Sequence, residues 1–416
     1  MKHLGLQSAI LLGLAAVALA QDSEYVLTRS RIVSLNADSA WTNCVELVKA
    51  APVIVNTIDS ASRLVAFSLP LAATDAKNLV LDAKDVEKQP LTLHVTIWIS
   101  QREKDTRLYV RAAPNGGGFF SHSNGQIERH ILDGIEKGGK WLTAGEDSAP
   151  RVIADAPPET VATKAVETVL AANLLKLNTS SLQPAMLTVS LMIPSAELGG
   201  FVSGLTKHYY PGASHVTLWF EPSGTGTRIR TRTLVVESGS LSPVPLASNG
   251  QLERALLHAI EAKVGGSADV PVAVGSGYRG KLEFWNVLFG IDAPPKSVEE
   301  PFRLIRELPV SLDRAWEAAL QVISQSQVVI RVERKAGDID FLAAHSTQTG
   351  TRYAVHAVAV ELASVGSGTR MSLSIPNAQE TAEESTGELK LIADRIGTEL
   401  FLKDRVTWLT DRKGTK

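Results

Sequence analysis

Three stretches of the chain alternate apolar and polar residues, and each passes through a short polar or glycine-rich turn. They cover 94–111, 215–232 and the segment from His356 onward, and after the turn each resumes at a Thr-Arg pair. Alternation with a period of two is typical of strands that bury one face. The pattern predicts three β-hairpins at equivalent places, with His94, His215 and His356 at the same position in each.

A second pattern follows each hairpin, with apolar residues three and four positions apart, as on one side of a helix. The phrases are SNGQIERHILDGI from Ser123, SNGQLERALLHAI from Ser248 and STGELKLIADRI from Ser385. A Ser followed three residues later by Gln or Glu is typical of a capping box, in which each side chain bonds the other's backbone N–H. The predicted pairs are Ser123/Gln126, Ser248/Gln251 and Ser385/Glu388.

A further helical pattern precedes the hairpins. It contains Trp41 in the first case and Trp316 in the last, and it covers 159–172 in the middle of the chain. Each unit then reads as strand, helix, four strands, helix. The predicted organisation is a signal peptide over 1–20 and three units over 21–148, 149–300 and 301–416, with a connector or insertion in 267–300.

The fold class that this order predicts is α+β, in three tandem repeats. Each repeat is an antiparallel sheet with two helices packed on one face, because each helix carries a single apolar stripe. In the first hairpin Val95, Ile97 and Ile99 are the aliphatic set and should lie under the helices. The opposite face is predicted to be open.

The pattern resembles a known family. The Trp-bearing helix, the strand pair after it (VVIRVERKAGDIDF in the last unit), the Thr-Arg hairpin and the capped last helix are similar to the repeated helix-grip domains of the BamC (NlpB) outer-membrane lipoproteins. Those proteins are accessory parts of the β-barrel assembly machinery. The resemblance covers all three units in outline and implies a helix-grip-like fold in the cell envelope. The chain lacks a lipid-attachment Cys and has three units, so the resemblance implies neither membership in that machinery nor any functional residue.

The amino terminus and the composition narrow the setting. A short basic start and an apolar run end in Ala18-Leu19-Ala20 before Gln21, which is typical of a cleaved signal peptide. No later stretch is long and apolar enough to span a membrane, so we expect a mature chain that is exported, periplasmic or extracellular, without a transmembrane segment. The formal net charge of -2 gives no general attraction to nucleic acid. Cys44, the single cysteine, excludes an intramolecular disulfide and is expected to be a buried small residue.

The sequence contains none of the common catalytic or phosphate-binding motifs, and its nine His residues are scattered. We therefore predict no catalytic residue, no metal site and no cofactor. The candidate binding surface is instead the open face of the first two hairpins, where Arg and Trp, both favoured in interfaces, fall opposite one another. The expected cross-strand pairs are Trp98 with Arg107, His94 with Arg111, Trp219 with Arg228, Thr217 with Arg230, and His215 with Arg232. The last unit has Val360 where the Trp would be.

These observations favour an exported, non-enzymatic repeat protein, a binding or scaffold module of the cell envelope that holds another envelope protein or a polymer through its open sheet faces. Two alternatives remain: a carrier of a small apolar ligand in a helix-grip cavity, and an enzyme whose site lies between units. The faces with Trp98 and Trp219 also have a structural interpretation, in which they pack against a neighbouring unit or form a solvated sheet face with stacked side chains.

Overall fold

The computed structural model describes residues 30–51, 53–71, 79, 91–102, 104–116, 119–138, 151–153, 155–204, 210–238, 243–266, 272–274, 302–346, 352–375, 387 and 389–401. The predicted signal peptide, the Ser385/Glu388 cap and all of the 267–300 connector except 272–274 lie outside these residues.

The predicted element order appears three times. Unit 1 consists of β1 (Ser30–Val33), α2 (Ala37–Ala50), β2 (Ile54–Asp59), β3 (Leu64–Leu71), β4 (Leu91–Arg102), β5 (Asp105–Gly116), β6 (Phe119–Ser121) and α4 (Gln126–Lys137). Unit 2 consists of β7 (Arg151–Ile153), α5 (Pro158–Ala171), β8 (Leu175–Leu182), β9 (Ala185–Ile193), α6 (Ser195–Leu198), β10 (Gly212–Ser223), β11 (Gly226–Ser238), β12 (Pro243–Leu246) and α7 (Gln251–Val264). Unit 3 consists of β13 (Phe302–Leu308), α9 (Leu312–Ser326), β14 (Val328–Glu333), β15 (Asp338–Ser346), β16 (Arg352–Val365), β17 (Gly368–Ile375) and a helix over 389–401.

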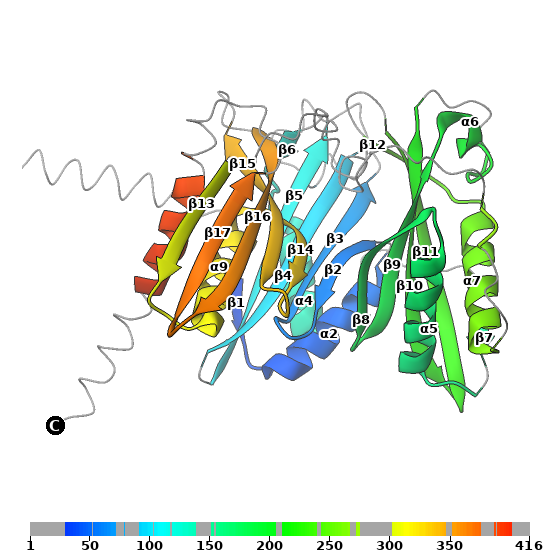
Figure 1. Cartoon of the computed structure of the whole chain (residues 1–416), viewed down its shortest axis with the longest axis horizontal. Coiled ribbons are helices and arrows are strands. Elements are labelled where there is room, and N and C mark those ends of the chain that lie inside the picture. The colour runs from blue at the N-terminus through cyan, green and yellow to red at the C-terminus, as the bar shows by residue number, and fades with distance from the viewer. Residues whose placement is uncertain are drawn as a thin grey trace, which may run out of the picture.

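The three sheets share one antiparallel topology. In unit 1 the first strand pairs the fifth, which gives the order β1-β5-β4-β3-β2. The orders β7-β11-β10-β9-β8 and β13-β17-β16-β15-β14 repeat it. A short pairing of β6 with β16 joins the sheets of units 1 and 3, and unit 2 has a separate sheet. Unit 1 lies between the other two (Figure 1).

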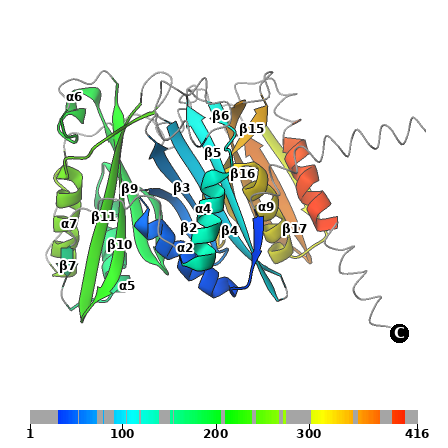
Figure 2. The same cartoon turned by 180° about the vertical axis from the view of Figure 1, so that it is seen from behind.

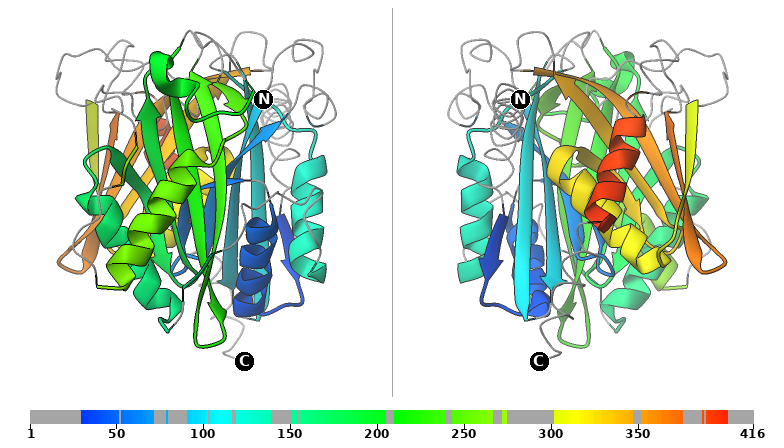
Figure 3. Two further views of the ribbon diagram at one scale, coloured as in Figure 1. Left: turned by 90° about the vertical axis from the view of Figure 1, so that its right-hand side faces the viewer. Right: turned by 90° about the vertical axis from the view of Figure 1, so that its left-hand side faces the viewer.

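Each unit buries one sheet face under its own two helices, as predicted. In unit 1, Val95, Ile97 and Ile99 pack with the stripes of α2 and α4. The view from behind shows these helices in front of the unit 1 sheet (Figure 2). In Figure 3, α5 and α7 cover the outer side of unit 2, and α9 with helix 389–401 covers unit 3. The α+β fold class with two helices on one sheet face is therefore confirmed.

The start of the last helix differs from the predicted capping box. The helix begins at Gln126, and its N-cap is Gly125 in the left-handed conformation (φ 81°) rather than Ser123. Ser123 Oγ accepts from the Gly125 N–H (3.1 Å) and donates to Glu128 Oε2 (2.8 Å), so Glu128 replaces Gln126 as its partner. Asn124 Oδ1 accepts from the Gln126 N–H (3.0 Å). The reason is glycine: its positive φ moves the chain reversal two residues beyond the Ser.

Unit 2 repeats this cap residue for residue. Ser248 Oγ accepts from the Gly250 N–H (3.0 Å) and donates to Glu253 Oε1 (2.9 Å). The repeated phrase is thus a structural device that begins a helix, although its bonds are not those of the predicted box.

Candidate functional site

The faces predicted to be open in units 1 and 2 are buried. Trp98 is 4% exposed and Trp219 is 3% exposed, while His94 and His215 are 2% and 0% exposed. The alternation assigned the two sheet faces correctly: the aliphatic set packs under α2 and α4, and Trp98 lies on the other face of the sheet. The predicted exposure was wrong, because a neighbouring unit covers each face.

The hairpin register is shifted by two residues from the prediction. Trp98 pairs with Tyr109 rather than Arg107, and Arg111 pairs with Thr96 rather than His94. In unit 2, Trp219 pairs with Arg230, Thr217 with Arg232, and His215 with Leu234. The tight turn decides this: the two-residue loop of unit 2 is Gly224-Thr225, with Gly224 at φ 62°, one residue later than assumed. A shift of two residues leaves every side chain on its predicted face.

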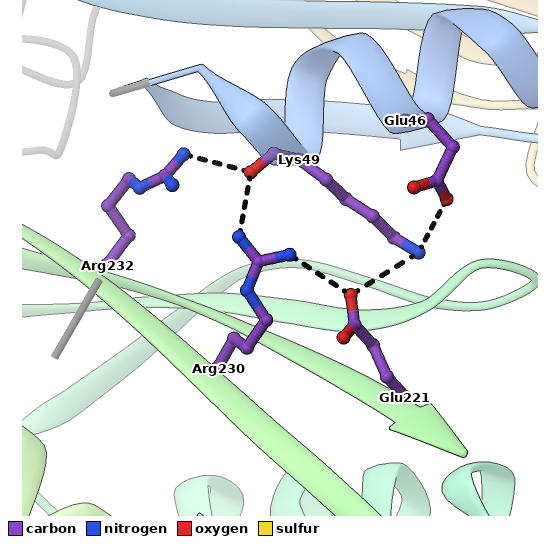
Figure 4. A network of polar contacts seen from close by, with 5 residues as sticks. All are labelled: Glu46, Lys49, Glu221, Arg230 and Arg232. Atoms are coloured by element: carbon purple, nitrogen blue, oxygen red, sulfur yellow. Dashed lines mark hydrogen bonds and ion pairs between the residues drawn. The ribbon is translucent and has the colours of Figure 1, made fainter. Parts of the chain in front are cut away.

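The first seam is the contact between the unit 2 sheet and α2 of unit 1 (Figure 4). Arg232 Nη1 and Arg230 Nη2 both donate to the backbone carbonyl of Lys49, at 3.1 and 3.4 Å. Glu221 Oε1 contacts Arg230 Nη1 (3.2 Å) and Lys49 Nζ (3.7 Å). The Lys49 ammonium also lies 5.7 Å from the ring centre of Trp219. Lys49 is near the C-terminus of α2, where the helix dipole is negative, so cations there stabilise the contact.

The second seam is the contact between the unit 1 sheet and α9 of unit 3. Trp98 stacks on Tyr109, with ring centres 4.9 Å apart and an interplanar angle of 18°, and both join the core that contains Trp316 of α9. Trp316 Nε1 donates to Ser62 Oγ at 3.0 Å. Arg111 Nη1 donates to the Gln325 carbonyl at 3.4 Å.

The two seams follow one docking rule. Lys49 and Gln325 each lie two residues before the C-cap of their helix, Ala51 and Gln327. Arg232 and Arg111 occupy the same register position, each across from a Thr of the adjacent strand. In both seams an arginine on the sheet face of one unit binds the last turn of the first helix of the neighbouring unit.

The other two predicted residues stay outside these contacts. Arg107 pairs with Ser100 on the hairpin and is half-buried, and Arg228 pairs with Glu221 and is exposed. The structure thus brings Trp219 and Arg232 into the first seam and Trp98 and Arg111 into the second.

A buried polar row, which the sequence analysis missed, holds each of the two histidines. Ser68 Oγ lies 2.9 Å from His94 Nδ1 and accepts from Asn56 Nδ2 at 2.9 Å. Burial lowers the pKa of the His94 imidazole to about 3. Ser68 and His94 are the residue types of a nucleophile–base pair, but Ser68 is fully buried and a pKa near 3 makes a weak base at neutral pH.

Unit 2 repeats the row with Asn178, Ser190 and His215. Ser190 pairs with His215 across the strands, and its Oγ donates to Asn178 Oδ1 at 3.2 Å. Burial lowers the pKa of His215 to about 3 as well. Asn56 and Asn178 each sit in a β-bulge, a feature without a clear sequence signal, which is why the rows were not predicted.

The third unit has an apolar counterpart of this row. Its bulge residue is Ile330, and Leu342 pairs with Ala357 where the other units pair Ser with His. The structural equivalent of His94 is therefore Ala357 and not His356. The same one-residue correction puts Glu361, rather than Val360, at the position of the two tryptophans.

The unit-3 face is the side of the unit 3 sheet turned away from α9 and helix 389–401, and it faces the viewer in Figure 1. Part of it, including Val328, Ile330 and Leu342, is buried against residues of units 1 and 2. The remainder consists of Arg303, Ile305, Glu307, Arg331, Glu333, Asp338, Asp340, Ala359, Glu361, Ala363, Arg370, Ser372 and Ser374. Ile305 is 53% exposed and belongs to none of the buried hydrophobic clusters of the described residues.

Other chemistry is limited within the described residues. They contain no group of three or more His, Cys, Asp or Glu side chains that could hold a metal ion. No helix among them is long and apolar enough to cross a membrane. Cys44 is buried, as expected, and burial raises the pKa of its thiol to about 12.

Comparison with protein-family models and with curated proteins gives no match. Among solved structures, the di-domain ARO/CYC StfQ from the steffimycin biosynthetic pathway matches 93% of this chain and 99% of its own, with 9% identity and a TM-score of 0.17. The di-domain ARO/CYC BexL from the BE-7585A biosynthetic pathway matches 61% and 96%, with 8% identity and a TM-score of 0.17. Such cyclases are enzymes, so the expectation of a non-enzymatic protein is contradicted and we withdraw it. A TM-score of 0.17 carries no activity or substrate over to this chain.

Proposed function

We propose that this chain is an exported binding module of the cell envelope, in which two sheet faces join the units and the unit-3 face takes a partner. One observation carries the proposal. Of three equivalent faces, two are consumed by internal docking, and the third keeps an exposed apolar residue, Ile305, among charged neighbours. The amino-terminal pattern that precedes Gln21 supports export.

The geometry suits a binding platform. A sheet whose other face is fixed to two helices is a rigid support, and binding to a rigid surface loses little conformational freedom. An apolar residue ringed by ion pairs, such as Arg303 with Glu361 at 3.1 Å, has the usual composition of an interface centre and rim. We therefore place the partner over β13, β17 and β16.

The experiment is capture from the native envelope fraction by immobilised chain 21–416. We expect a captured protein that Ile305→Asp releases. The matched control is Ile32→Asp, since Ile32 is a 52% exposed isoleucine on β1, the equivalent strand of unit 1. Capture that is equal for both variants, or that Ile32→Asp alone abolishes, would refute the proposal.

A carrier of a small apolar ligand is the second candidate, because each unit has the helix-grip-like layout in which a ligand lies between sheet and helix. In unit 1 that space contains Phe67, Ile127 and Ile131, all fully buried, so a ligand would have to displace them. Organic extraction of the purified chain followed by mass spectrometry distinguishes the two, because a carrier would release a stoichiometric apolar compound.

An enzyme with an inter-unit site remains a third possibility. The ionisable cluster between units consists of Glu46, Lys49, Glu221, Arg230 and Arg232 (Figure 4). Both carboxylates are paired with Lys49 or Arg230, and both arginines donate to the carbonyl of a helix terminus, an arrangement that suits docking better than catalysis.

A further inference from the structure

The three equivalent sheet faces differ in the sign of their charge. At the position of Trp98 and Trp219, unit 3 has Glu361. At the position of Arg111 and Arg232 it has Ser374, which lies across from Ala359. Both groups that make the internal seams are therefore absent from the unit-3 face.

The ligand of the first two faces is known from the structure. Each face binds the last turn of a helix, whose free carbonyl groups carry a partial negative charge. Arg232 and Arg111 supply the complementary positive charge. The charge of the face therefore matches the polarity of the element that it binds.

The unit-3 face has the opposite balance. It carries three arginines and five carboxylates: Arg303, Arg331 and Arg370, with Glu307, Glu333, Asp338, Asp340 and Glu361. The arginines are already engaged, Arg303 by Glu361 and Arg331 by Asp340 at 2.8 Å. Next to Ile305, Arg303 and Arg370 balance Glu361 and Glu307. The two negative charges in excess lie on β14 and β15, where Arg331 alone contacts three carboxylates, those of Glu333, Asp338 and Asp340.

We infer that the occupant of the unit-3 face is a cationic segment of another protein, rich in Lys or Arg, that brings an apolar residue onto Ile305 and its positive charges over Asp338 and Asp340. This rests on the proposed function and specifies the chemistry of its partner. Charge complementarity between the two surfaces would favour their encounter and fix their orientation.

A second copy of the chain is a poorer occupant. A second copy would have to offer α5, the unit 2 helix equivalent to α2 and α9, because the last turn of α5 takes part in neither seam. Leu170 of α5 is exposed at the position equivalent to Lys49 and Gln325. The last turn of a helix is negative, and Ser374 and Glu361 offer it no positive partner. The docking rule inside the chain thus ends at unit 3, as expected for a terminal repeat with a polar outer face.

The test uses three synthetic peptides of one length and one leucine pattern, with Lys, Glu or Gln at the remaining positions, labelled for fluorescence anisotropy. The protein is the chain 21–416. The charge variant is Glu361→Gln with Asp338→Asn, and the matched control is Glu159→Gln with Asp105→Asn, which removes two exposed carboxylates elsewhere. All variants are first checked for an unchanged unfolding midpoint.

We expect the Lys peptide to bind more tightly than the other two. The charge variant should bind it about five- to thirty-fold more weakly, and the control should bind it as the original chain does. Added salt should weaken the interaction. Equal binding of the Glu or Gln peptide, or an equal loss in both variants, would overturn the inference.

Two outcomes separate the inference from the proposed function. If an envelope protein is captured in an Ile305-dependent way while the charge variant captures it equally well, the platform stands and the cationic partner is excluded. If a chain ending at residue 401 binds the Lys peptide far more tightly, the occupant is the chain's own basic segment 402–416. If the chain forms a concentration-dependent dimer that Glu361→Gln abolishes, the occupant is a second copy. Either result overturns the inference.

Discussion

Acid should lower the free energy of unfolding of this protein through its two buried histidines, and the size of the effect can be calculated. Burial lowers the pKa of His94 and His215 from 6.5 to about 3, so each stays neutral when folded and becomes charged when unfolded. Such a group contributes stability above pH 6.5 that is lost as the pH falls towards 3. Between pH 8 and pH 5 the loss is about 2 kcal/mol for each histidine and about 4 kcal/mol for both.

The assay is urea unfolding at pH 8 and pH 5, followed by tryptophan fluorescence. We expect the free energy of unfolding of the original chain to fall by about 4 kcal/mol over this interval. His94→Gln should lower stability at both pH values but reduce the pH-dependent part by about 2 kcal/mol. The matched control is His258→Gln, since His258 is exposed on α7 and lies outside the two buried polar rows.

One result would refute this reasoning. If His94→Gln and His258→Gln show the same pH dependence as the original chain, then His94 is not held neutral by burial, and the polar row with Ser68 is not closed to water. His94 lies on β4 and His215 on β10, the central strands of the two docked faces, so separation of the seams should accompany the loss of stability.

Three further predictions follow from the same contacts. Trp98→Ala should lower the free energy of unfolding by about 3–5 kcal/mol in urea titrations, because it leaves a cavity in a buried site. The control Ile305→Ala, at an exposed position, should change it by less than about 0.5 kcal/mol. A small effect at Trp98 would instead support its predicted role as an exposed binding residue. Arg232→Ala should cost about 1.5–3 kcal/mol and Arg228→Ala almost nothing, measured the same way, and equal costs would mean that the bond to the α2 carbonyl contributes nothing. Ser248→Ala should cost about 0.5–2 kcal/mol, seen as a lower thermal midpoint, because it leaves Glu253 without its partner, and an unchanged midpoint would refute that role of the cap.

The sequence alone determined the local features of this protein. Periodicity placed the strands and helices, and the recurring phrases at Ser123 and Ser248 marked the same helix start in two units. Alternation also put Trp98 and Val95 on opposite faces, because side-chain direction along a strand depends only on position in the chain. Even the two-residue error in the hairpin register left that assignment intact.

What only the tertiary structure decided is what lies on each face. A strand with Trp, Thr and Arg on one side has the same sequence pattern whether solvent, a ligand or another unit covers that side, because interfaces and exposed faces have similar residue compositions. The partners that decide it are distant in sequence: Arg232 binds Lys49, and Arg111 binds Gln325. The buried row of Asn56, Ser68 and His94 likewise depends on a bulge and two neighbouring strands. Contacts of this kind are set by the docking of whole units, which no pattern within a unit encodes.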